Sequence, residues 1–260
     1  MCCSVVCLFY FTLTYIYFIR CSRKKGVSVS AAVSWRRGGK GLYLLEVEDD
    51  SNVSAKRNEL ATLLTEIGSM LQERQVVEDE NFDPDATEDI CVWTAKQAGD
   101  AVMRMSGEYD RGMVYRFQDD LSGEILHEIK NDDKLKSSYL GMRFPAGDMP
   151  LSCRQLQIIN GLRYVSDANV PSSKIVCAKD VAVDLTHCRM RGVAAPHVDY
   201  LRNMGVRSSM VVSILASRKL WGMLSFHGYS HAFKPDLHLR IAFETVAQMV
   251  SIRIASLFKR

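Results

Sequence analysis

The segment from Arg191 to His227 constrains the fold most, because it sets imidazole and guanidinium groups among apolar residues and strand-forming runs. It opens RGVAAPHVDYLRNMGV and continues as two apolar runs on either side of the triplet SRK at 217–219. A buried cation or imidazole is costly unless it is paired. His197, His227 and Arg191 are therefore expected to converge on a pocket for a flat, charged ligand with a polar rim.

The pattern of apolar residues predicts an α+β domain in which helices flank a central antiparallel sheet. Helical stripes are expected over 54–74 and from Asp85, which can cap a helix with Glu88 as its capping-box partner. A long helix is expected from Asp236 to the C-terminus. Strand-forming runs are expected at 113–117, 123–129, 163–165, 174–178, 210–216 and 220–227.

The spacing of apolar residues also predicts one apolar face on each helix, and the face of the second helix is expected to be buried. The expected positions are Leu60, Leu63, Leu64, Ile67, Met70 and Leu71 in the first helix, then Ile90, Trp93, Ala98, Ala101, Val102 and Met105, and finally Ile241, Val246, Met249, Val250 and Ile252.

Residues 1–19 are uncharged and almost wholly apolar or aromatic, with Arg20, Arg23, Lys24 and Lys25 directly after them. Two interpretations stay open. The run is about long enough to span a bilayer, and the basic residues would then keep the following domain cytoplasmic. Alternatively, a spurious translation start produced it. The next residues, 26–50, are expected to form one or two strands, with GLYLLEVE (41–48) the clearer one.

Composition excludes several classes of function. The net charge of +3 gives no indication of nucleic-acid binding. The eight cysteines form no CxxC pair and no zinc-type spacing, so no metal site is expected and free thiols in a reducing compartment are favoured. The chain has no P-loop, no HExxH and no GxSxG, and we expect no enzymatic activity.

Four motifs in order resemble the bilin-binding GAF domain of phytochromes, especially those of the bacterial type. They are MVYRF (113–117), FPAGDMP (144–150), PHVDYLRNMGV (196–206) and the LWG run at 220–222 with His227 beyond it. The resemblance covers about residues 90–258 and implies a GAF domain over 88–258. It also implies that 26–50 is the tail of a PAS domain and that 54–87 is a helix with an acidic linker.

The resemblance also implies which side chains contact the chromophore, a linear tetrapyrrole such as biliverdin. Asp148 and His197 would lie beside the pyrrole nitrogens, and His227 would contact the carbonyl of the far ring. Arg163, Arg191 and Ser209 would bind the propionates, while Tyr115 and Tyr200 would pack on the rings. Phe144 is either a further ring contact or ordinary core.

Two departures from the family's pattern stand out. Pro196 takes the place of the attachment cysteine found in plant-type members, and Cys188 does not match that motif. The N-terminal cysteines have no complete PAS domain behind them, so binding is expected to be non-covalent or incomplete. Gln157 stands where the family usually has a tyrosine.

The resemblance therefore implies a red/far-red photoreceptor whose light-driven isomerisation switches an output outside this chain. The expected partners are a second copy, paired through helices, and a downstream kinase or response regulator, with no nucleic acid. The alternative is a GAF regulatory or dimerisation module that binds another small ligand or none.

Overall fold

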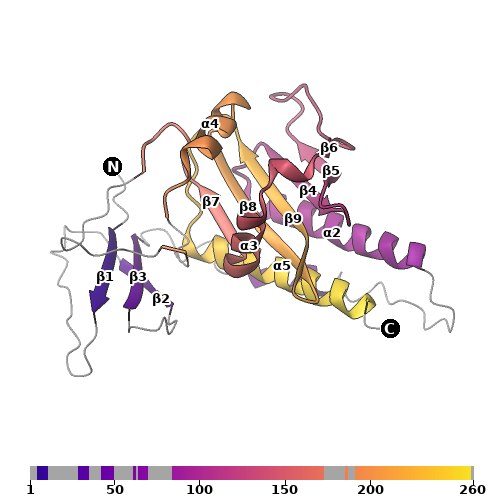
Figure 1. Ribbon diagram of the computed structural model, residues 1–260, viewed down its shortest axis with the longest axis horizontal. Helices are drawn as coiled ribbons and strands as arrows, with labels where there is room; N and C mark the ends of the chain where they lie inside the picture. Colours follow the sequence, from indigo (N-terminus) through magenta and orange to yellow (C-terminus); the bar gives the residue numbers. More distant parts are fainter. Residues whose placement is uncertain are drawn as a thin grey trace.

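The computed structural model of the chain describes residues 5–10, 29–34, 42–49, 61–62, 64–69, 84–172, 185–186 and 191–258. Its largest element is a six-stranded antiparallel sheet in the order β6-β5-β4-β9-β8-β7 (Figure 1). The strands are β4 (Arg111–Phe117), β5 (Gly123–Lys130), β6 (Arg143–Phe144), β7 (Leu162–Val165), β8 (Ser208–Ala216) and β9 (Lys219–Gly228). The expected antiparallel α+β architecture is confirmed, while the strand expected at 174–178 lies outside the described residues.

The central hairpin of the sheet turns tightly between β8 and β9. Ala216 pairs with Lys219, so the loop consists of Ser217 and Arg218 alone. Both residues have positive φ, 49° and 67°, as a two-residue turn that follows the twist of the strands requires. This hairpin places the two strands that carry Ser209 and His227 side by side.

Two long helices cover one face of the sheet (Figure 1). Helices α2 (Pro84–Ser106) and α5 (Leu237–Leu257) contact each other, and both contact the sheet. Asp236 caps α5 by accepting a hydrogen bond from the amide of Leu239 at 2.8 Å. Their apolar stripes and the alternate strand residues that face them form the main core, in which Val114, Leu224 and Phe226 are fully buried.

The opposite face of the sheet carries shorter elements. These are the 3₁₀ turn η1 (Ala146–Asp148), α3 (Leu151–Asn160) and α4 (Ala195–Asn203). Helix α3 contacts β7, β8 and β9, and Leu201 of α4 packs in a small second cluster with Val165 of β7. Figure 1 shows α3 on the side of the sheet away from α2 and α5.

The predicted helix faces hold for the centre of each stripe and fail at its margins. Ala98, Ala101, Val102, Val246 and Val250 are buried as expected. Ile90, Trp93, Met105 and Met249 are only partly buried. Ile241 and Ile252, which were expected on or near one face with Val246 and Val250, are 47% and 71% exposed, because α5 turns its Phe243–Val246–Val250–Ile254 line toward the core instead. The helix expected over 54–74 is described at 61–62 and 64–69, where Ile67 is buried and Leu64 packs against the core; Leu60, Leu63, Met70 and Leu71 lie outside the described residues.

The N-terminal part contains a three-stranded antiparallel sheet in the order β1-β3-β2. Its strands are β1 (Val5–Tyr10), β2 (Val29–Ser34) and β3 (Leu42–Asp49), which agrees with strands expected over 26–50. Within the apolar run of residues 1–19, Val5–Tyr10 is a strand paired with β3 and not a helical turn. Among the helices described here, none is long and apolar enough to cross a membrane.

Candidate functional site

Strand alternation gathers the candidate residues on the face of the sheet opposite α2 and α5, which we call the site face. Val165, Ser209, His227 and Arg111 are directly paired across β7, β8, β9 and β4, so their side chains point to the same side. Two residues further along the strands, Arg163, Val211, Ser225 and Met113 make a second such row. Tyr115 follows one step beyond Met113 on β4. The sheet thus brings Arg163, Ser209, His227 and Tyr115 onto one surface, as a common site requires.

His227 is the most unusual group on the site face. Its side chain is buried at 8% exposure, and its Nδ1 has no hydrogen-bond partner among the described residues. Nε2 lies 3.5 Å from the hydroxyl of Ser225. Burial lowers the pKa of His227 to about 3, and the Arg111 guanidinium and His197 act in the same direction. The imidazole is therefore neutral. Its Nδ1 is buried away from solvent and has no hydrogen-bond partner in the described part of the protein.

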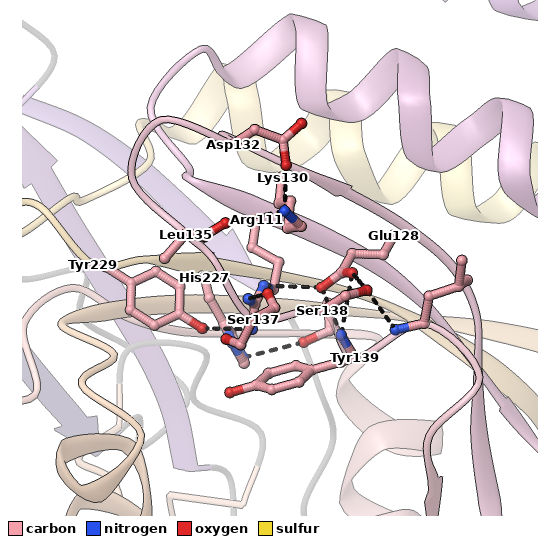
Figure 2. A network of polar contacts seen from close by, with 12 residues as sticks. Arg111, Glu128, Lys130, Asp132, Leu135, Ser137, Ser138, Tyr139, His227 and Tyr229 are labelled. Atoms are coloured by element: carbon pink, nitrogen blue, oxygen red, sulfur yellow. Dashed lines mark hydrogen bonds and ion pairs between the residues drawn. The ribbon is translucent and has the colours of Figure 1, made fainter.

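Beside His227 lies a buried ion pair that sequence reasoning missed (Figure 2). Arg111 Nε is 3.1 Å from Glu128 Oε1, and the two side chains are 1% and 3% exposed. Arg111 also donates to the hydroxyl of Tyr229 at 3.1 Å and to the carbonyl of Ser137 at 2.7 Å. Its guanidinium carbon lies 3.9 Å from the centre of the Tyr139 ring. The signal was present in the sequence, because Arg111 precedes Tyr115 by four residues on one strand and so shares its face.

The ring of Tyr115 on β4 lies over Gly123 of the neighbouring strand β5, where a side chain larger than hydrogen would collide with it. A Cβ built on Gly123 would be 1.9 Å from Tyr115 Cζ. The Tyr115 ring contacts Phe117 edge to face at 5.0 Å and the ring of Phe144 at 5.9 Å. Phe144 is therefore half-buried and packs next to Tyr115, while its contact with a ligand stays a prediction.

Asp148, Tyr200 and His197 surround the same region from η1 and α4. Burial raises the pKa values of Tyr115 and Tyr200, and the Asp148 carboxylate adds to the rise in both. The rings of His197 and Tyr200 stack with centroids 6.2 Å apart. Asp148 and both rings are solvent-exposed, in contrast to His227. Nearby protein still displaces enough water to lower the pKa of His197, and the Arg163 cation lowers it further.

Arg154 of α3 holds the loop that carries Asp148, and it too was missed. It is 6% exposed and donates to three backbone carbonyls, those of Met149 at 2.8 Å, Ala146 at 3.1 Å and Leu121 at 2.6 Å. Its guanidinium carbon also lies 4.4 Å from the centre of the Phe117 ring. The sequence gives no clear signal for this role, because an arginine in the first turn of an amphipathic helix usually faces solvent.

The two arginines expected to bind propionates are linked to each other. Arg163 Nη2 donates to the backbone carbonyls of Arg191 at 2.6 Å and Gly192 at 2.9 Å, and Arg191 Nη1 donates to the carbonyl of Thr186 at 2.7 Å. These hydrogen bonds to backbone carbonyls fix the positions of both guanidinium groups. Both arginines are partly buried. The Arg163 cation acts on His197, and the backbone of Arg191 is fixed to Arg163.

The departures from the expected motifs also have visible structural roles. Gln157 ties α3 to the sheet, because the Ser213 hydroxyl lies 2.9 Å from its backbone carbonyl and 3.0 Å from its Oε1. Pro196 occupies the first turn of α4, where its missing N–H costs nothing. Of the cysteines that the structure describes with side chains, Cys91 is buried and Cys153 on α3 is exposed; Cys188 lies outside the described residues. Among the described side chains no group of three His, Cys, Asp or Glu forms a metal site.

The family model of the GAF domain matches residues 101–254. The chain belongs to the GAF domain family. This GAF domain is 39% identical over 156 residues to a bacteriophytochrome of Pseudomonas aeruginosa, an overlap of 58% of this chain and 21% of that protein. It is 36% identical over 159 residues to cyanobacterial phytochrome B of Nostoc sp., an overlap of 60% and 21%. The chain thus spans about a fifth of the length of these curated relatives.

Solved structures give the same assignment for the fold. The chromophore-binding domain of an unusual bacteriophytochrome from R. palustris superposes with a TM-score of 0.71 at 26% identity, covering 88% of this chain and 70% of that one. The chromophore-binding domain of a Stigmatella aurantiaca bacteriophytochrome, in a mutant form, superposes with a TM-score of 0.74 at 24% identity, covering 88% and 69%. The expected GAF fold with phytochrome relatives is confirmed.

Proposed function

We propose that this GAF domain is the bilin-binding sensory module of a red/far-red photoreceptor. The observation that carries the proposal is His227, a buried neutral imidazole whose Nδ1 has no partner in the described part of the chain. A buried polar atom without a partner costs about 1–3 kcal/mol, so such an atom at the centre of a site calls for a ligand group. The phytochrome relatives make a linear tetrapyrrole the natural candidate.

The residues present fit that group. If the Ser225 hydroxyl donates to His227 Nε2, then Nδ1 carries the proton and donates to a ligand carbonyl. Arg163 and Arg191 supply cations for the propionates, with Ser209 as a hydroxyl on the same face of the sheet. Tyr115, Phe144 and Tyr200 supply aromatic contact for the conjugated body. A bound bilin supplies the visible absorption and the isomerisable double bond.

Asp148 and His197 have a different task in this proposal. Both are exposed, and both lie at the rim of the aromatic group. A carboxylate and a neutral imidazole at that place can accept protons from pyrrole N–H groups and exchange them with solvent. We assign proton exchange after illumination to this pair, and static binding to the buried residues of the sheet.

The finer features of the proposal are the following. The bilin, biliverdin or a related one, is held without a covalent bond, because Pro196 offers no nucleophile at the usual position. The chain itself catalyses no reaction, and the signal passes to a kinase or response regulator outside it. A second copy of the chain pairs through helices. The identity of the bilin and its non-covalent binding are tested below by absorption and by gel fluorescence.

The direct test is to add biliverdin to the purified full chain and record its absorption spectrum. The proposal predicts a red or far-red band that saturates at one bilin per chain. His227→Leu, which removes the polar ring and keeps the site filled, is expected to weaken or shift the band, while Ser256→Ala, at an exposed hydroxyl on α5 far from the site face, leaves it unchanged. A chain that folds and gives no band in excess biliverdin is instead a GAF module for another ligand or for none.

A further inference from the structure

The Arg111–Glu128 pair is buried, and its contacts point in two directions. Toward the sheet, Arg111 is the direct cross-strand neighbour of His227 between β4 and β9. Toward the surface, the pair binds the loop over 137–139 (Figure 2). Arg111 donates to the Ser137 carbonyl at 2.7 Å, and the amide of Tyr139 lies 3.1 Å and 3.2 Å from the two oxygens of Glu128. The Ser138 hydroxyl donates to the same carboxylate.

These contacts form a small enclosure around the imidazole. The loop brings the Tyr139 ring against the Arg111 guanidinium, and Tyr139 helps burial to raise the pKa of Tyr229. The Tyr229 hydroxyl accepts from Arg111, and its ring meets the His227 ring at a centroid distance of 6.3 Å. One cation therefore ties together the loop, the residue after β9 and the strand beside His227.

Both partners of the pair are buried, so the small contribution to stability that is typical of exposed ion pairs does not apply to it. Replacing a buried pair of this kind by apolar residues is often tolerated in proteins, which means that fold stability alone gives weak grounds for it. Its position gives a better reason. A fixed cation next to an imidazole disfavours the protonated ring.

We propose that the buried Arg111–Glu128 pair is a positioning device for His227, which fastens the 137–139 loop beside the imidazole and holds that imidazole as an uncharged hydrogen-bonding group toward the ligand. The identity of the ligand rests on the proposed function, whereas the device itself is a property of the chain without ligand. Glu128 orients the Arg111 guanidinium and offsets part of its positive charge. The Arg111 cation in turn disfavours protonation of His227.

In the part of the chain that the structure describes, the charged and titratable groups around His227 can be tested one by one by substitution. They are Arg111 on β4, Glu128 on β5, His197 on α4, Tyr229 after β9 and Tyr139 in the loop. Removing Arg111 takes away a cation and leaves a carboxylate, which favours protonated His227 on both counts. Removing the charge of Glu128 leaves the cation uncompensated, which disfavours it. A purely structural pair would give both variants the same effect.

The experiment follows His227 in the chain without bilin by imidazole nitrogen NMR between pH 4.5 and 8, with the signal assigned by its loss in His227→Gln. The parent and Glu128→Gln are expected to show no protonation of His227 in that range. In Arg111→Met its pKa is expected to rise by at least about 1 unit, so that protonation becomes visible at the acid end. If Arg111→Met does not fold, the double variant Arg111→Met/Glu128→Gln replaces it, because it leaves no unpaired buried carboxylate. In the double variant the pKa of His227 is expected to rise by less than in Arg111→Met.

A second readout in the same samples is amide hydrogen exchange at Tyr139, which should accelerate in both single variants. Arg143→Met, at an arginine whose side chain is 73% exposed, serves as the control and should change neither readout. The proposal is overturned if His227 behaves alike in Arg111→Met and Glu128→Gln, or if Tyr139 exchange is unaffected by both. No bilin is present in this experiment, so its outcome does not bear on the proposed function. Likewise, failure to form a bilin band would not bear on the role of the Arg111–Glu128 pair.

Discussion

Asp110 provides a quantitative test of how the segments around the site are held together. Asp110 is 4% exposed. Its carboxylate accepts hydrogen bonds from the backbone amides of Tyr229 at 2.8 Å and Ser230 at 3.0 Å. It also accepts from the Ser230 hydroxyl and from Lys134 Nζ, the latter at 2.7 Å. It therefore joins the start of β4 to the loop after β5 and to the segment after β9. Tyr229, which Asp110 positions, is the residue whose hydroxyl accepts from Arg111.

The magnitude follows from the ionisation of this carboxylate. Burial alone would raise the pKa of Asp110, but the hydrogen bonds from Lys134, Tyr229 and Ser230 outweigh it and lower the pKa from 3.8 to about 2. That difference corresponds to about 2 kcal/mol of folding free energy. Because the pKa is lowered in the folded state, the stabilisation is fully present above about pH 5. It is lost as the pH falls toward 2, with roughly half gone by pH 3.

The assay is urea unfolding of the parent and of Asp110→Asn between pH 7 and pH 3, followed by tryptophan fluorescence. At pH 7 the variant is expected to be less stable by about 2 kcal/mol or more, since the amide cannot pair with Lys134. The gap should narrow by about 1 kcal/mol by pH 3. Asp119→Asn, at an exposed carboxylate in the β4–β5 turn, should stay within about 0.5 kcal/mol of the parent. A gap that is the same at pH 7 and pH 3 would show that the carboxylate's charge does not stabilise the fold, and would refute this reasoning.

Three further predictions concern the site itself. Gly123→Ala should displace the Tyr115 ring and cost about 1–3 kcal/mol in urea unfolding, whereas Gly68→Ala, whose Cβ would meet only Met249 Cε at 3.9 Å, should be neutral or stabilising; equal effects would mean that Tyr115 does not lie over Gly123. Arg154→Met should leave three backbone carbonyls without their donor and cost about 1–3 kcal/mol in the same assay, and stability equal to the parent would remove Arg154 from its role in holding the Asp148 loop. After acid denaturation with bilin, the chain should show no zinc-induced fluorescence on a gel; a fluorescent band that disappears in Cys153→Ser would instead identify that exposed thiol as an attachment point.

Local periodicity was sufficient to predict the elements of the sheet and the helices around it. Strand-forming runs over 113–117 and 220–227 correctly indicated strands, and the helix expected from about Asp236 is α5, which begins at Leu237. Periodicity could not indicate which side of α5 faces the sheet at its margins. Ile241 and Ile252 are apolar but exposed, since the choice of face depends on how α5 packs against α2 and β8.

The candidate site was predicted in part, and the missing part has a physical explanation. The motifs named residues that are expected to touch a ligand, such as His227 and Asp148, and this remains a prediction. They did not identify Arg111, Glu128 and Arg154, which bind other parts of the chain. Glu128 lies 17 residues from Arg111, and the pairing of β4 with β5 brings the two together. Arg154 binds backbone carbonyls of a neighbouring loop and of Leu121, contacts that depend on how α3 packs on the sheet.

The most direct test of the central claim is the change in absorption of the biliverdin-loaded chain under red light. The account predicts that red illumination lowers the red or far-red band, that the band recovers in darkness or under light of the other colour, and that Asp148→Ala retains the band but loses most of the change. A band that forms and does not respond to light in the parent chain would contradict a photoreceptor function. A normal light response in Asp148→Ala would leave that residue as the end of a 3₁₀ turn and no more.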